Sequence, residues 1–127
     1  MFKRFFTRTK AASVPVIIVG TDYLSYQLGE SLKQQQQFVP LFFINQEPWH
    51  HRTKMLDAEL RYENELIALV KHYGIRAVCC VEPTDYQHYQ THFADQLHTH
   101  HCKVLFSPSA AELPSLFKAT SSSIANS

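Results

Sequence analysis

Short apolar runs alternate along the chain with longer amphipathic stretches. The runs are rich in β-branched residues and are bounded by glycine or proline, which is typical of buried strands. They predict strands at residues 14–20 (VPVIIVG), 38–44 (FVPLFFI), 75–81 (IRAVCCV) and 102–107 (CKVLFS). Pro40 has no backbone N–H, so the second strand should either begin there or lack a neighbour on one side at that point.

Between these runs, apolar residues recur at helical spacing. We expect a helix from about Tyr23 to Gln35, and a second helix that opens at Asn64 and stops at Gly74. Thr84 or Asp85 is expected to cap a third helix. The apolar stripe of this third helix consists of Tyr86, Tyr89, Phe93 and Leu97.

Strands separated by helices of this length predict a parallel sheet whose right-handed crossovers cover both faces. The expected fold class is α/β, a Rossmann-like three-layer domain with a mainly parallel sheet of about four to five strands. Residues 45–61 are expected to be irregular, with a short extended piece near Met55–Leu60. The expected organisation is a basic arm at 1–13, the Rossmann-like domain at 14–112 and a flexible tail at 113–127.

The composition fits one globular domain. Of 127 residues, 45% are hydrophobic and 18% are charged, enough for a packed core. The three cysteines, Cys79, Cys80 and Cys102, form no Cys-x-x-Cys pair and suit buried thiols in a reducing compartment. Core packing is therefore favoured over nucleophilic chemistry at these residues.

Charge is distributed unevenly along the chain. Four of the twelve basic residues fall in the first ten positions, which leaves eight basic and eleven acidic residues for the remaining chain. A mildly acidic body is not expected to bind nucleic acid. No apolar run is long enough to span a membrane, and the start lacks the apolar stretch of a signal peptide.

The N-terminal arm has two interpretations. Phe2, Phe5 and Phe6 lie among cations, a pattern that could make weak contact with a membrane surface. A frayed, solvated terminus is the commoner outcome for such a segment. The expected location is cytoplasmic, with peripheral attachment at the inner face of the membrane as the alternative.

Ligands of parallel α/β sheets bind outside the carboxyl ends of the strands, beside the topological switch point. Here that rule places residues 20–23, 45–47 and 82–84 around one opening at the carboxyl edge of the sheet, which we call the mouth. Glu82 ends a buried strand at this mouth, where it would either hydrogen-bond a ribose or sugar hydroxyl or simply face water. The candidate binding residues are Gly20, Thr21, Asp22, Tyr23, Asn45, Gln46, Glu82 and Pro83.

The order of these segments resembles a known family. It is similar to the N-terminal nucleotide-binding (CoA-binding-like, Rossmann-type) domain of bacterial polysaccharide biosynthesis proteins, which are membrane-associated nucleotide-sugar epimerases and dehydratases. The matching stretches are VPVIIVGTDYLSYQLGESL at 14–32, FVPLFFINQEP at 38–48, ELIALVKHYGIRAVCCVEP at 65–83 and KVLFSPS at 103–109. The resemblance implies a nucleotide ligand, with NAD(P) as one candidate cofactor, and a stand-alone, degenerate copy of the domain.

The chain departs from the family pattern at the phosphate-binding loop. The family implies Gly-x-Gly-x-x-Gly, and here the run is Gly20-Thr21-Asp22-Tyr23-Leu24-Ser25, so only the first glycine is present. Asp22 adds bulk and negative charge where a pyrophosphate would approach. Asn45 stands where an acid usually binds the ribose hydroxyls. An amide can still bind a hydroxyl and would not repel a 2′-phosphate, and Glu47 is an alternative partner for the ribose.

The family's catalytic step belongs to a separate domain that uses a Tyr-x-x-x-Lys pair. None of the six tyrosines here is followed by lysine four residues later. The resemblance also implies a membrane region, for which this stretch of sequence has no counterpart. We therefore expect no catalytic residue in this chain.

Eight histidines are many for this length. His88 and His92 are one helical turn apart and Asp95 continues the row, a spacing that two metal ligands can use. The same spacing describes an ordinary solvent-facing surface, which we favour here. A denser group at His98, His100, His101 and Cys102, and the loop pair His50 and His51, are likewise interpreted as surface residues, so no metal site is expected.

Three functions remain open. The first is a non-catalytic module that binds a nucleotide or nucleotide sugar and regulates, or pairs with, an enzyme of surface-polysaccharide metabolism. The second is an interaction or homodimerisation domain that has lost its ligand, which the acid at position 22 favours. The third and weakest is a metal-binding protein that uses surface histidines.

Overall fold

The computed structural model describes residues 13–45 and 52–118. Its centre is one six-stranded sheet in the order β3-β4-β2-β1-β5-β6. The strands are β1 (Val14–Val19), β2 (Phe38–Ile44), β3 (Lys54–Met55), β4 (Ala58–Arg61), β5 (Ala77–Cys80) and β6 (Lys103–Phe106). The helices are α2 (Tyr23–Gln35), α3 (Leu66–Tyr73) and α4 (Pro83–Thr99), with short 3₁₀ turns η2 (Glu63–Glu65) and η3 (Ala110–Glu112).

The predicted α/β fold with a mainly parallel sheet is confirmed. All neighbouring strands are parallel except β3 and β4, which form an antiparallel hairpin at one edge. This hairpin occupies the predicted extended piece near Met55–Leu60 and raises the number of strands to six. From β1 the chain passes to β2 on one side, and it later returns to β5 on the other side. The direction in which successive strands are added therefore reverses between β1 and β5, and this pair is the topological switch point of the sheet.

Pro40 lies where β2 has only one strand neighbour. The strand pairs with β1 from Phe38 to Ile44 except at Leu41, but β4 covers only Phe42, Phe43 and Ile44. The register against β1 also shifts after Pro40 and skips Leu41. A residue without an N–H is tolerated here because no second ladder is formed at this point.

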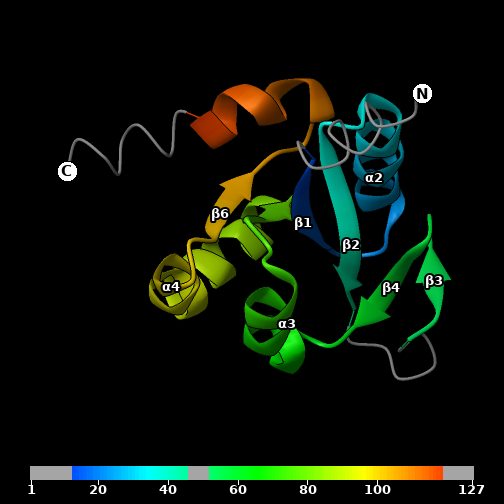
Figure 1. The fold of residues 1–127 in the computed structure, drawn as a ribbon. Helices are drawn as coiled ribbons and strands as arrows, with labels where there is room; N and C mark the ends of the chain where they lie inside the picture. The colour runs from blue at the N-terminus through cyan, green and yellow to red at the C-terminus, as the bar shows by residue number, and fades with distance from the viewer. Residues whose placement is uncertain (1–12, 46–51, 119–127) are drawn as a thin grey trace, which may run out of the picture.

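The sheet is covered on both faces (Figure 1). One apolar cluster packs α2 and the C-terminal segment against the sheet through Leu28, Leu32 and Leu113. The other packs α3 and α4 against the opposite face through Leu66, Tyr89 and Leu97. The three-layer arrangement follows from β1, whose Val16 and Ile18 face one cluster while Ile17 and Val19 face the other.

The ends of the helices agree in part with expectation. Gly74 ends α3 in the left-handed conformation, as predicted, and α2 spans the predicted residues. The helix expected from Asn64 begins as a 3₁₀ turn and becomes α-helical only at Leu66. Neither Thr84 nor Asp85 caps α4; the helix begins earlier, at Pro83, whose fixed φ and missing N–H suit the first turn.

The folded part continues beyond residue 112, where the flexible tail was expected to begin. Residues 113–118 are helical. Leu113 is completely buried in the α2 side of the core, and the ring of Phe117 packs edge-on against Phe38 at 5.6 Å between centroids. The apolar residues at 113 and 117, one helical turn apart, anchor this segment. The remaining predictions for 1–12 and 119–127 lie outside the described residues.

Over residues 13–45 and 52–118, none of the helices combines the length and the apolar character needed to cross a membrane.

Candidate functional site

The turn between β1 and α2 is built around Gly20. Its φ of +100° is a conformation that side chains rarely allow, and its amide donates to the carbonyl oxygen of Ile44 at 2.9 Å. A Cβ at this position would lie 2.7 Å from Oγ of Ser25. The single glycine that remains of the expected loop is therefore required by both the backbone and its neighbour.

Asp22 caps α2 with its own side chain. Oδ1 accepts a hydrogen bond from the amide of Ser25 at 3.1 Å. The hydroxyl of Ser25 is buried and lies 3.1 Å from both that carboxylate oxygen and the carbonyl oxygen of Val19. A carboxylate thus occupies the helix N-terminus, where a dinucleotide-binding loop would present an amide to phosphate.

Asn45 joins the end of β2 to this turn. Its backbone amide donates to the carbonyl oxygen of Arg61, and its side-chain Nδ2 donates to Oγ1 of Thr21 at 2.8 Å. Both Thr21 and Asn45 are half-buried. The two sequence-predicted binding residues are thereby held side by side at the carboxyl edge.

Glu82 and Pro83 lie across the mouth from the Gly20 turn. Val19 pairs with Cys80, so the residues that follow β1 and β5 leave the sheet next to each other. Glu82 is half-buried and is the N-cap residue of α4, although its side chain makes no capping hydrogen bond. This confirms the predicted proximity of the strand ends, but the binding roles of these residues stay predictions.

The mouth is rich in negative charge. Partial burial raises the pKa of Asp85 above its ordinary value, and the nearby carboxylates of Asp22 and Glu63 raise it further, while His88 opposes them. These groups come from the β1–α2 turn, the turn after β4 and the first turns of α4. A phosphate entering here would meet this charge as well as the Asp22 cap.

A hydrogen-bonded network links η2 to α4 beside the mouth. Glu63 accepts from the hydroxyl of the buried Tyr89 at 2.9 Å through Oε1, and Oε2 lies 3.1 Å from Nε2 of His88. Sequence analysis missed this network because Glu63 is more than twenty residues from either partner. It placed Tyr89 correctly on the buried stripe, but it interpreted His88 only as a solvent-facing residue.

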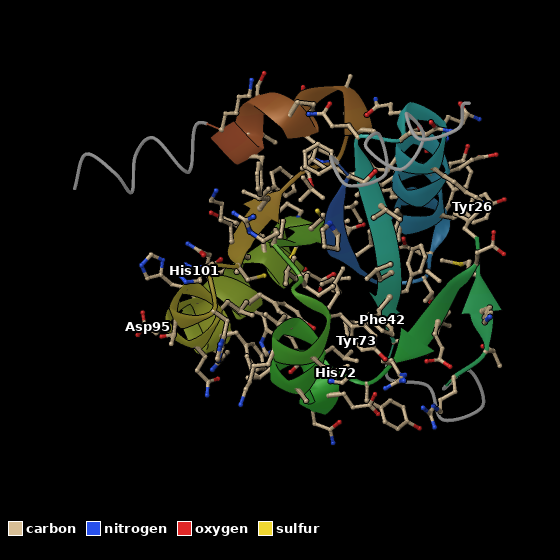
Figure 2. All side chains as sticks on the ribbon, viewed as in Figure 1. Tyr26, Phe42, His72, Tyr73, Asp95 and His101 are labelled. Atoms are coloured by element: carbon tan, nitrogen blue, oxygen red, sulfur yellow. The ribbon has the colours of Figure 1, made fainter. Side chains whose placement is uncertain are left out.

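Other sequence candidates lie away from this arrangement. Tyr23 is 71% exposed, and its hydroxyl accepts from Nε2 of Gln27. His92 packs against the ring of His88 on the outer face of α4, whereas Asp95 and His101 project away from the body of the molecule (Figure 2). Gln46, Glu47, His50 and His51 lie outside the described residues.

The part of the chain that the structure describes contains no group of three or more histidine, cysteine or acidic side chains that could hold a metal ion. The three cysteines are buried and unpaired. Burial raises the pKa of the Cys79 and Cys102 thiols to about 12, and it raises that of Cys80 as well. Thiols protonated at neutral pH are poor nucleophiles, which agrees with core packing.

Surface hollows lie elsewhere on the molecule, and the two with the larger volumes are away from the carboxyl edge. One, of about 430 Å³, is lined by Val39, Pro40 and Leu41 along the uncovered part of β2 and by the β3–β4 turn. The other, of about 570 Å³, lies at the end of α3 beside Tyr73, whose ring packs on Phe42 at 4.9 Å (Figure 2). Both are largely apolar, although the Lys33–Asp57 ion pair borders the first and Lys71 the second, and neither is lined by the Gly20 turn, Asn45 or Glu82.

Comparison with known proteins identifies the fold. No protein-family model matches the chain, and no curated protein matches its sequence. Its structure is similar to the crystal structure of UDP-D-quinovosamine 4-dehydrogenase from Vibrio fischeri, with a TM-score of 0.62 and 25% identity over 82% of this chain and 85% of that chain.

The structure is also similar to RSP, a Rex-family repressor. The TM-score is 0.59, with 16% identity, for its complex with β-NADH, and 0.58, with 17% identity, for its complex with β-NAD⁺ and operator DNA. The match covers 79% of this chain in both cases and just under half of the RSP chain. These likenesses show that the chain has a Rossmann-like fold.

Proposed function

We propose that this chain is a non-catalytic module that binds a nucleotide or nucleotide sugar at the carboxyl edge of its sheet. The observation that carries the proposal is the Gly20 turn, which lies beside the linked side chains of Thr21 and Asn45 at the switch point of the sheet. Ligands of open α/β sheets bind at this point. RSP, which shares the fold, has been crystallised with β-NADH and with β-NAD⁺.

Each side of the mouth would contribute differently. Asn45 and Thr21 would bind the ribose of a nucleoside, and the turn at Gly20 would lie closest to the phosphates. Glu82 would accept from a hydroxyl of the ribose or of an attached sugar. No residue is assigned a catalytic role: Asp22 caps α2, and Glu63 is bonded to Tyr89 and lies within hydrogen-bond distance of His88.

Asp22 determines how strongly phosphate can bind. Its carboxylate already accepts from the Ser25 amide, so an incoming phosphate must either displace it or lie beside it. At a separation of about 4 Å, two unit charges repel by roughly 1–4 kcal/mol between bulk water and a protein surface. We therefore expect a modest affinity, dominated by the nucleoside and sugar.

The proposed context is surface-polysaccharide or nucleotide-sugar metabolism, with an enzyme of that pathway as the partner whose activity the module regulates. The likeness to a UDP-sugar dehydrogenase over most of both chains supports this context. The proposed location is the cytoplasm, with the basic arm as a weak contact to the inner membrane face. Binding to nucleic acid is not proposed, because the chain beyond its first ten residues carries more acidic than basic residues.

A thermal-shift panel with NAD⁺, NADP⁺, CoA, ATP and UDP-glucose tests the proposal. A ligand at about 100 times its dissociation constant should stabilise the fold by roughly 2.7 kcal/mol. Isothermal titration of any nucleotide that shifts the melting temperature should then give one site per chain. Absence of a shift with every member of the panel at millimolar concentration would exclude nucleotide binding.

A ligand-free interaction domain is the second candidate. It is favoured by the capped N-terminus of α2 together with the exposed apolar side chains of Tyr23, Leu24 and Tyr26, which are 71%, 39% and 39% accessible. Such a surface would mediate homodimer formation or contact with a partner. Sedimentation analysis of the purified chain, done alongside the panel, distinguishes the candidates: a dimer without any nucleotide response supports the second.

A further inference from the structure

The sheet ends at β6, which pairs with β5 on one side. Among the described residues, no other strand pairs with the outer side of β6 (Figure 1). The amides of Lys103 and Ser107 donate to carbonyl oxygens at or next to the two ends of β5. Because the backbone groups of successive residues in a strand point to opposite sides, those of Val104 and Phe106 point outward. β6 therefore presents donors and acceptors along the edge of the sheet.

A groove keeps this outer side accessible beside α4. Its volume is about 250 Å³. One wall is formed by α4 residues four positions apart and the other by the start of β6: Tyr86, Gln90, Ala94, His98, Cys102, Lys103 and Val104. The one exposed side chain of β6 is apolar, since the ring of Phe106 is 38% accessible and lies 6.1 Å from the ring of Tyr86 between centroids. The edge is thus open and carries an exposed aromatic ring.

The two edges of the sheet differ in their protection against association. Natural edge strands are commonly protected by being very short or by carrying charged side chains. At the opposite edge, β3 consists of only Lys54 and Met55, and the lysine is exposed. β6 is longer, and its one charged side chain, Lys103, stands at its first residue with Nζ 4.0 Å from the ring centroid of Phe117. The middle of β6 therefore lacks the usual protection.

We propose that the outer edge of β6 is a self-association surface, at which a second copy of this chain pairs antiparallel with β6 and continues the sheet. A two-fold axis at Leu105 would place Val104 of each copy opposite Phe106 of the other, so that the outward backbone groups of both residues donate and accept. The proposal does not rest on the proposed function, because it uses neither the residues at the mouth nor the exposed side chains of α2.

The side chains of β6 favour a copy of the same strand as the occupant. Val104 and Phe106 lie on one face of the sheet, and an aromatic ring opposite a β-branched residue is a favourable cross-strand pair. The charge of Lys103 favours the antiparallel direction. Antiparallel pairing separates the two lysines to opposite ends of the joined strands, whereas parallel pairing would bring these like charges side by side.

Sedimentation equilibrium over a range of protein concentrations tests the association. The intact chain should show a monomer–dimer equilibrium. Phe106→Pro removes an outward amide that β5 does not use, and should raise the dimer dissociation constant about tenfold or more, because both copies lose a hydrogen bond. Phe106→Val keeps the amide and a β-branched apolar side chain, and should change the constant by less than about threefold. Circular dichroism and urea unfolding show whether each variant is folded.

Amide hydrogen exchange measured by NMR locates the interface without any substitution. The amides of Val104 and Phe106 should exchange at least about tenfold more slowly at a concentration where the dimer predominates than in the monomer. Leu105 is the internal control, because its amide is directed at β5, and its exchange should change much less.

Three results would overturn the proposal. The first is a chain that stays monomeric at every concentration. The second is exchange at Val104 and Phe106 that does not slow when the dimer forms. The third concerns the other exposed surface: Tyr23→Ser on α2 should leave the dimer intact, and a dimer lost in that variant but kept in Phe106→Pro would place the association surface on α2.

Discussion

Oδ1 of Asp22 accepts a hydrogen bond from the backbone amide of Ser25 at 3.1 Å, and the buried Ser25 hydroxyl lies at the same distance from it. The carboxylate therefore has two roles that can be separated. It caps α2, which stabilises the fold, and it places negative charge where phosphate would bind. Substitutions that preserve the cap while removing the charge distinguish these roles.

We expect Asp22→Asn to increase the affinity for NAD⁺ by about fivefold or more, because roughly 1 kcal/mol of repulsion is removed. Asparagine is as good an N-cap as aspartate, so the free energy of unfolding should stay within about 0.5 kcal/mol. Asp22→Gly removes the bulk as well and should bind more tightly still. Titration calorimetry and urea unfolding provide the two readouts, and unchanged affinity in both variants would show that this turn does not contact phosphate.

Gly20→Ala should destabilise the protein more than Gly74→Ala does. Both glycines have positive φ, but a Cβ at Gly74 meets no atom within 4 Å, whereas at Gly20 it lies 2.7 Å from Ser25 Oγ. Gly74→Ala should cost about 1–2 kcal/mol for its backbone conformation, and Gly20→Ala at least about 1 kcal/mol more. In a Ser25→Ala background, which lacks the Oγ that the new Cβ would meet, urea unfolding should show a smaller loss of stability for Gly20→Ala. The loss for Gly74→Ala should be the same in both backgrounds.

Tyr89→Phe should lower the free energy of unfolding by about 1.5–3 kcal/mol, since the buried hydroxyl donates to the carboxylate of Glu63. Tyr86→Phe is the matched control on the same helix, because the described residues show no hydrogen bond to its hydroxyl; its effect should stay within about 0.5 kcal/mol. Equal losses in the two variants would mean that the link between η2 and α4 contributes nothing to stability.

Alkaline pH should destabilise the fold through its buried thiols. Burial raises the pKa of Cys79 and Cys102 to about 12, whereas an unfolded cysteine titrates near about 8.5. The folded state thus keeps protons that the unfolded state has lost. The stabilisation is complete below about pH 8.5 and is lost as pH rises towards 12, by up to about 1.4 kcal/mol per pH unit for each thiol.

Urea unfolding at pH 7.5 and pH 10 measures this slope. Cys79→Ala should be less stable at pH 7.5, because it leaves a cavity, but it should lose less stability between the two pH values. The same slope in the variant and the intact chain would show that the Cys79 thiol is not responsible.

The alternation of apolar runs and amphipathic stretches was sufficient to predict the parallel core of the sheet. The β1, β2, β5 and β6 strands lie within the predicted runs because each has a buried apolar stretch, which fills the whole of β5, the last four residues of β1, the last three of β2 and the middle two of β6. The hairpin of β3 and β4 was harder to predict. Only Ala58 and Leu60 of β4 face the core, so the segment carries a weak alternating signal over a few residues.

The sequence predicted the candidate-site residues that stand at the end of a strand. It did not predict the hydrogen bonds between site residues that are far apart in the sequence. Gly20 and Asn45 follow directly from the strand ends. The bonds from Glu63 to Tyr89 and from Asn45 to Thr21 join residues more than twenty positions apart, and no local pattern marks either pair. Similarly, Leu113 is buried by its packing with residues of α2 and β2 that lie far away in the sequence, and no local pattern marks that contact.

The packing of Phe117 against Phe38 has a practical consequence. Phe38 is the first residue of β2 and pairs with Val14, the first residue of β1, so both described ends of the chain meet at the amino edge of the sheet. The mouth lies at the opposite edge. A tag, a fluorophore or a covalent tether to a sensor surface could thus be attached at either end without facing the binding edge, so an immobilised form of the domain should present that edge to solution.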